Sequence, residues 1–142
     1  MEYKEIICED AWKACCGAGY PLGAFKFKSK NTELYSINRK LHREGEPAYI
    51  EYHEGTGKIK IKEYFLNNKY YRVDGPAINH YYSNGTIRLE EYYLNDQLHR
   101  EDGMAFIEYD ENRVPIRGFY FLFGGGMSKE EWENQIQTKL YW

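Results

Sequence analysis

The chain has 142 residues, a formal net charge of −3 and fifteen tyrosines. This length fits one domain, and no segment approaches the ~18 consecutive apolar residues of a membrane-spanning helix. A negative net charge disfavours a general nucleic-acid binder, which is typically strongly basic. The three cysteines, Cys8, Cys15 and Cys16, make a poor disulfide framework, and no apolar run near Met1 resembles a secretion signal. We therefore expect a reducing, cytoplasmic setting.

Residues 1–32 are expected to form a cap at the N-terminal end of a single domain that spans residues 1–142. Residues 9–16 predict a short helix with Trp12, Cys15 and Cys16 on one face and Gly17 as its stop. The segment before this helix is also compatible with a strand. Further on, residues 24–28 and 33–37 predict a hairpin.

Residues 33–123 contain about three copies of one imperfect phrase. Its arginine recurs at Arg43, Arg72 and Arg100, so the spacing is 29 and then 28 residues, which marks an array of small repeated units. A strand rich in aromatic residues precedes the phrase, and a second strand that ends in tyrosine follows it. Two strands per unit predict a mainly β fold, an antiparallel meander of two-stranded hairpins that forms an open twisted sheet or a solenoid-like stack. The three copies are Leu41–Ala48, Tyr70–Ala77 and Leu98–Ala105.

The turn residues agree with a meander of hairpins. The pairs Asn67-Asn68 and Asn95-Asp96 tolerate the positive φ angles of tight hairpin turns, and Asn84-Gly85 is a strong hairpin signal. In the segment Asp74-Gly75-Pro76 we expect a kink in which Gly75 supplies an unusual dihedral angle and Pro76 starts the next strand.

Residues 127–142 are expected to form a C-terminal capping helix. Ser128 and Glu131 have the spacing of a capping box, and Trp132, Ile136 and Leu140 recur every four residues to give one apolar stripe. We expect this helix to lie on the last hairpin and to cover the open edge of the array.

The two histidines of the phrase, His42 and His99, lie two units apart, with Tyr71 at the position between them. At ~4.8 Å per strand, four strands separate them by ~19 Å, which excludes a shared metal ion. We expect each histidine to lie beside its turn and to bond a backbone carbonyl.

The arginines of the phrase have a functional and a structural interpretation. Guanidinium groups match the geometry of phosphates, but we favour each arginine bonding the acidic residue or the open carbonyls of its own turn. Gly45 replaces the aspartate in the first copy, which leaves Arg43 the most free to bind a partner. The residues assigned to the structural motif of the repeat are His42, Arg72, Asp74, Gly75, Pro76, His99, Arg100, Asp102 and Gly103.

Lysines alternate on two predicted strands, so each strand is expected to project three like charges from one face. Residues 1–71 hold 12 basic and 10 acidic residues, a net +2, whereas residues 72–142 hold 7 and 12, a net −5. The lysines either solubilise the sheet and protect its edges or meet an anionic partner, an acidic protein or a nucleic acid. The candidate partner-binding residues are Lys26, Lys28, Lys30, Lys58, Lys60, Lys62 and Arg43.

The phrases Leu98–Ala105 and Asp74–Ala77, between tyrosine-rich strands, resemble the MORN-like repeat variants of phage and giant-virus proteins. The resemblance covers residues 33–123, and the unit is longer and poorer in glycine than a true MORN repeat. It implies a non-catalytic scaffold, without cofactor, metal or membrane, that binds and blocks or redirects a host protein, such as a defence nuclease complex in an anti-CRISPR-like role. The alternatives are nucleic-acid or nucleotide binding by the Tyr/Lys-rich sheet face and a structural part of a viral particle.

Overall fold

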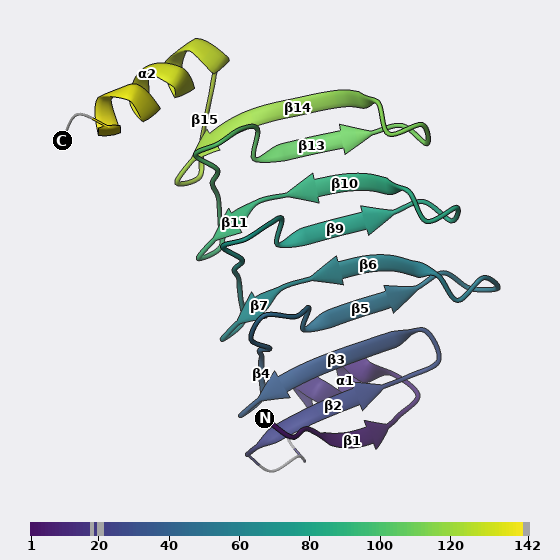
Figure 1. Cartoon of the computed structure of the whole chain (residues 1–142). Coiled ribbons are helices and arrows are strands. Elements are labelled where there is room, and N and C mark those ends of the chain that lie inside the picture. Colours follow the sequence, from purple (N-terminus) through teal and green to yellow (C-terminus); the bar gives the residue numbers. More distant parts are fainter. Residues whose placement is uncertain (18, 20–21, 141–142) are drawn as a thin grey trace.

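The computed structural model describes residues 1–17, 19 and 22–140, and its fold is mainly β, as predicted (Figure 1). Two helices, α1 (Ala11–Cys16) and α2 (Lys129–Leu140), lie near the two ends of the chain. The strands are β1 (Lys4–Ile7), β2 (Ala24–Lys28), β3 (Thr32–Ile37), β4 (Lys40–Leu41), β5 (Tyr49–Tyr52), β6 (Ile59–Glu63), β7 (Phe65–Leu66), β8 (Lys69–Tyr70), β9 (Ile78–Tyr81), β10 (Ile87–Glu91), β11 (Tyr93–Leu94), β12 (Gln97–Leu98), β13 (Phe106–Tyr109), β14 (Pro115–Leu122) and β15 (Gly125–Met127).

One sheet runs through the whole array in the order β1-β2-β3-β5-β6-β9-β10-β13-β14-β15, and β4 pairs with β3. The β1–β2 pair is parallel and every other pair is antiparallel. The short hairpins β7–β8 and β11–β12 form separate two-stranded sheets. Figure 1 shows them as a second column at one side of the ladder of long hairpins.

A turn with two successive positive φ angles recurs in every unit. The predicted pairs Asn67-Asn68 (50° and 65°) and Asn95-Asp96 (49° and 63°) have this conformation. Two further turns, Asn38-Arg39 and Phe123-Gly124, have it as well, although the sequence analysis did not single them out. Such turns match the twist of antiparallel strands. The same hairpin therefore recurs along the chain from residue 38 to residue 124.

Three of these four turns hold the unit before them through their second residue. The Leu41 N–H donates to Asn68 Oδ1 at 2.6 Å, and the Asn68 N–H donates to the Leu41 carbonyl at 2.9 Å. Asp96 makes the same two bonds with Tyr70, at 2.6 and 3.0 Å. In the last unit Gly124 donates its N–H to the Leu98 carbonyl at 2.9 Å, but it has no side chain to accept a bond in return. We call this two-bond contact the clasp.

The core lies at the N-terminal end, where α1 covers one face of β2 and β3. Ala11 and Cys15 of α1, with Phe27 and Leu34 of the two strands, are buried there. The Trp12 ring lies 5.4 Å from the Tyr49 ring, between centroids. As predicted, Gly17 ends the helix, but Cys16 is exposed, so the expected face shared by Trp12, Cys15 and Cys16 is wrong for Cys16. The buried face is centred on Ala11 and Cys15 instead, one turn apart.

The predicted capping box of α2 is confirmed. The Ser128 N–H donates to the Glu131 carboxylate at 2.8 Å, and the Glu131 N–H donates to Ser128 Oγ at 3.2 Å. Trp132 packs on Tyr120 at 5.1 Å between ring centroids and donates its indole N–H to the Arg100 carbonyl.

The expected apolar stripe of α2 does not pack along its full length, because Leu140 is 79% exposed and no residue of the helix is fully buried. The helix is held instead by its first turn and by an ion pair of Lys139 with Glu101, and it projects from the last hairpin (Figure 1). Among the described residues, no helix has the length and apolar character needed to cross a membrane.

Gly124→Asn should stabilise the protein, because an asparagine there supplies the acceptor that the last clasp lacks. Asn tolerates the positive φ of this position, 80°, and a Cβ would meet only ordinary contacts with Gln97 at 3.8 Å. We expect the free energy of unfolding in urea to rise by ~0.5–1 kcal/mol. Gly124→Ala is the control. It adds the Cβ without the acceptor and should lower stability, so equal effects of the two substitutions would contradict the clasp.

Candidate functional site

The arginines of the repeated phrase bond groups within their own turns, as favoured from the sequence. The Arg72 guanidinium lies 4.0 Å above the Tyr64 ring, donates to the Pro76 carbonyl at 3.1 Å and bonds Asp74 at 2.9 Å. Arg100 repeats this arrangement on Tyr92, the Met104 carbonyl and Asp102, at 3.9, 3.1 and 2.7 Å. Each arginine thus has a ring against one face and hydrogen-bond partners at its edge, and Asp74 and Asp102 are the predicted acidic partners.

Arg43 is not free, which corrects the expectation from Gly45. Its guanidinium lies 3.8 Å above the Tyr35 ring, donates to the Pro47 carbonyl at 3.2 Å and pairs with Glu46. Glu46 therefore replaces the aspartate that the first copy lacks. Gly45 itself adopts a φ of 74°, with nothing within 4 Å of its Cβ position.

The expected unusual dihedral angle does not explain the glycines of the other two phrases, Gly75 and Gly103. Gly75 and Gly103 do not have positive φ. A Cβ on Gly75 would lie 2.9 Å from Cζ of Arg72, and one on Gly103 would lie 3.3 Å from Cζ of Arg100. Glycine at these two positions leaves room for the guanidinium to pass close to the backbone.

Arg72→Lys should destabilise the fold, because an ammonium group cannot stack on Tyr64 and bond Asp74 and the Pro76 carbonyl together. We expect a loss of ~1–3 kcal/mol in the free energy of unfolding. The matched control is Arg88→Lys, since Arg88 is exposed and lies 6.0 Å from the Tyr82 ring. Similar losses for the two variants in chemical denaturation would refute the structural role of Arg72.

His42 and His99 accept hydrogen bonds rather than bonding a carbonyl, which corrects the prediction. Nδ1 of His42 accepts the Asn67 N–H, and Nδ1 of His99 accepts the Phe123 N–H, both at 3.1 Å. Each histidine therefore bonds the first turn residue of the next unit, beside the clasp. Nε2 lies 3.8 Å from Glu44 in one copy and 3.5 Å from Glu101 in the other. The described part of the chain contains no group of three or more His, Cys, Asp or Glu side chains arranged to hold a metal ion.

The lysines do not form the predicted one-sided rows. The pairing register shifts between Ile59 and Ile61, which marks a β-bulge. Because of it, Lys60 bonds Glu51 at 2.7 Å on one face, whereas Lys62 lies over the Tyr81 ring on the other. Lys58 precedes β6 and donates to the Asn84 carbonyl at 3.4 Å.

On β2 only Lys26 and Lys28 share a face, because Lys30 lies beyond the end of the strand. Lys26 pairs with Glu5 at 3.2 Å and with Glu33 at 3.5 Å, and Lys28 lies 4.0 Å from Glu33. These ion pairs offset much of the positive charge that the sequence places at this end. A partner-binding role of the lysines stays a prediction.

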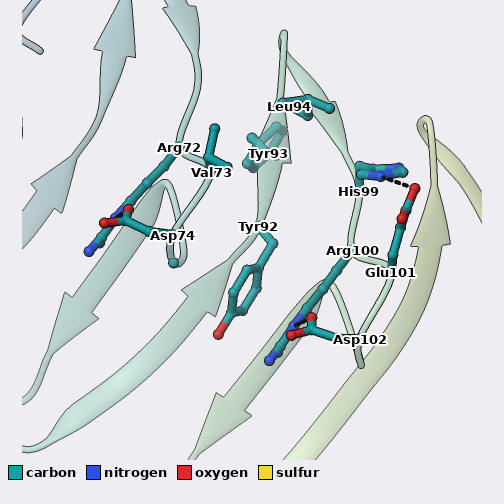
Figure 2. Close-up of a pocket in the computed structure, with 11 residues that line it drawn as sticks. Arg72, Val73, Asp74, Tyr92, Tyr93, Leu94, His99, Arg100, Glu101 and Asp102 are labelled. Carbon is teal, nitrogen blue, oxygen red and sulfur yellow. Dashed lines mark hydrogen bonds and ion pairs between the residues drawn. The ribbon is translucent and has the colours of Figure 1, made fainter. Parts of the chain in front are cut away.

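The phrases enclose a row of open notches, one at each boundary between units. The largest, about 560 Å³, lies between the second and third phrases, and another of about 380 Å³ lies between the first and second. Figure 2 shows the ring of Tyr92 between the Arg72–Asp74 and Arg100–Asp102 pairs. The larger notch is lined by Arg72, Val73, Asp74, Gly75, Tyr92, Tyr93, Leu94, His99, Arg100, Glu101 and Asp102, and the smaller by Arg43, Glu44, Gly45, Tyr64, Leu66, Tyr71, Arg72, Val73 and Asp74. We call this row the notched edge.

The notches of this edge are lined by both apolar side chains and exposed carboxylates. Leu66 lines the smaller notch and Leu94 lines the larger one, and Val73, which is 78% exposed, lines both. The carboxylates of Glu44 and Asp74 stand at the rim with side chains 85% and 86% exposed. The arginines and aspartates of the notched edge were predicted to belong to the repeat motif, whereas its apolar residues were not predicted to belong to a site. Leu66 and Leu94 recur at one position of the repeat, before the turn, and this recurrence is the signal in the sequence that could have found them.

The face of the sheet that α1 covers at one end carries two poorly solvated carboxylates farther along. The register puts Glu63, Ile78 and Glu91 in one row, and the Tyr70 hydroxyl donates to Glu63 at 3.5 Å. Burial raises the pKa of Glu63 to about 7, and it raises the pKa of Glu91 as well. The charged form of Glu63 is therefore disfavoured in the folded protein.

The protein should lose stability as the pH rises from about 4.5 through 7, because folded Glu63 keeps a proton that the unfolded chain has released. Glu63→Gln removes the part of this dependence that Glu63 causes, and leaves the part caused by Glu91. It should raise the free energy of unfolding by ~1 kcal/mol at pH 8 and leave it nearly unchanged at pH 4.5. Urea titrations at the two pH values check this, with exposed Glu111→Gln as the control. A Glu63→Gln effect equal at both pH values would contradict it.

The cysteines are poorly suited to act as nucleophiles. Cys15 is a buried residue of α1, and burial raises the pKa of its thiol, as it does for Cys8. A raised pKa lowers the fraction of reactive thiolate. Cys15 therefore serves packing in the N-terminal core.

No protein-family model, curated protein or solved structure matches this chain in the comparisons made.

Proposed function

We propose that the chain is a non-catalytic protein-interaction scaffold, encoded by a virus or phage, that binds and inhibits or redirects a host protein in the host cytoplasm. The observation that carries this proposal is the recurrence of one notch, with the same kinds of side chain, at successive unit boundaries. A periodic surface of this kind suits an extended partner, which is how repeat proteins commonly bind. A host defence nuclease complex is the target class that the resemblance favours.

The use made of the polar side chains supports a non-catalytic role. The arginines, aspartates and histidines that recur in the phrase bond their own turn or the next unit. A group that holds a repeat together is not available as a nucleophile or base without disturbing its neighbours. Nucleic-acid binding by the sheet face is less favoured, since Lys26 and Lys60 are paired with carboxylates.

Affinity capture from a host lysate at low salt tests the proposal. The tagged chain should retain one protein in a stoichiometric amount, because a built surface selects a specific partner. An excess of untagged chain should release that protein, which separates specific retention from adhesion to the tag or resin. Recovery of no stoichiometric protein, or retention that untagged chain does not reverse, would refute the scaffold function.

A further inference from the structure

We propose that the notched edge binds a basic, proline-rich segment in the polyproline II conformation, with one apolar side chain entering each notch. This inference rests on the proposed function and names its partner class.

The spacing of the notches matches one turn of a polyproline II helix. Each unit adds two strands to the sheet, so equivalent positions in adjacent units lie ~9.6 Å apart along the array. A polyproline II helix has three residues per turn and rises ~9.3 Å in each turn. Residues i, i+3 and i+6 of such a segment therefore point to one side at the period of the notches. Residues i and i+3 of a β-strand point to opposite sides, so a strand does not fit.

The notches are lined by aromatic and apolar side chains, which are the kinds of residue that bind a polyproline II segment. Tyr64, Tyr71 and Leu66 line the smaller notch, and Tyr92, Tyr93 and Leu94 line the larger one. Polyproline II ligands dock into grooves lined by aromatic rings, because their conformation is fixed before binding.

Free hydroxyl groups favour polyproline II over an α-helix, whose spacing of two turns is also near 10 Å. Across residues 1–17, 19 and 22–140, the hydroxyls of Tyr64 and Tyr71 make no hydrogen bond. The carbonyls of a polyproline II segment have no internal partners, so they can accept bonds from these hydroxyls. The carbonyls of an α-helix are already used.

The rims favour a cationic partner. Glu44 and Asp74 flank the smaller notch and Asp102 stands at the larger one, all three with exposed side chains, whereas Glu101 is paired with Lys139 of α2. Arg72 and Arg100 face inward against Tyr64 and Tyr92, so the outer surface presents carboxylates rather than guanidinium groups. Arginines flanking the proline-rich segment would meet these carboxylates.

The N-terminal segment of the chain supplies a precedent at the first phrase. Tyr3 precedes β1 and lies outside any helix or strand, and it lines a third notch together with His42 and Arg43. Its ring packs edge-on against Tyr35 at 5.3 Å, and its hydroxyl donates to the His42 carbonyl at 3.3 Å. Tyr35 is the equivalent of Tyr64 and Tyr92, because each is covered by the arginine of its own phrase. An irregular segment thus already packs on the notched edge.

Fluorescence anisotropy tests the inference with a labelled peptide in which Leu-Pro-Pro is repeated three times between flanking arginines. The full chain should bind it at low salt. Val73→Arg, which puts a bulky cation between the two notches, should weaken binding about tenfold or more. The matched control Val114→Arg changes another exposed valine, 53% exposed and outside both notches, and should bind like the unchanged chain.

Three peptide controls separate the features of the ligand. A peptide of the same composition with adjacent leucines lacks the three-residue period, and one with flanking glutamates reverses the charge. Both should bind about tenfold more weakly. An alanine-rich helical peptide with the same flanking arginines should bind no better than these two control peptides. Absence of binding by the Leu-Pro-Pro peptide, an unchanged affinity of Val73→Arg, or equal binding of the helical peptide would overturn the inference.

Failure of this inference is distinguishable from failure of the proposed function. If lysate capture yields a protein that Val73→Arg retains as well as the unchanged chain does, the scaffold function stands and the notched edge is not its site. If nothing is captured, the proposed function itself fails. Because Val73 is exposed, its substitution should leave the fold intact, which a thermal unfolding scan of both valine variants verifies.

Discussion

The clasp between a turn and the unit before it is the contact on which this architecture depends. Asn68 and Asp96 each give and accept one hydrogen bond with the preceding short strand. These bonds lie outside the main sheet, so they fix the short hairpins in a column of their own. The main sheet sets the distance between successive units, whereas the clasp sets the position of each short hairpin relative to the one before it. The notches recur because the column of short hairpins and the ladder of long hairpins repeat with the same period.

The arginine of each phrase decides the charge of the notched edge. Its guanidinium covers a tyrosine ring and satisfies a carbonyl within the turn, where it is shielded from solvent on one side. The carboxylate that pairs with it remains at the surface. A repeat rich in arginine therefore presents an acidic rim. The lysines of the N-terminal half are similarly offset by neighbouring glutamates, so the net charge of a segment does not describe the surface that a partner meets.

The two ends of the array differ in how they are covered, and this difference bears on binding. At the N-terminal end α1 buries one face of β2 and β3, which gives the domain its largest apolar core. At the C-terminal end α2 is fixed by Trp132 and an ion pair while most of its length is exposed. The notched edge lies between these ends. It is built from backbone turns and stacked rings that are held from unit to unit, so it is preorganised for an extended ligand.

The sequence by itself determined the repeat of 28 and 29 residues, the hairpin turns at Asn67-Asn68 and Asn95-Asp96, the capping box at Ser128, and the pairing of Arg72 with Asp74. All of these depend on groups within a few residues of one another or on a spacing repeated along the chain. The tertiary structure alone decided that Lys60 and Lys62 lie on opposite faces, that Arg43 is engaged, and that His42 accepts a bond from the next unit. It also created the apolar floor of the notches. These features depend on a bulge and on which units become neighbours, and a one-residue shift in register is enough to exchange the faces of a strand.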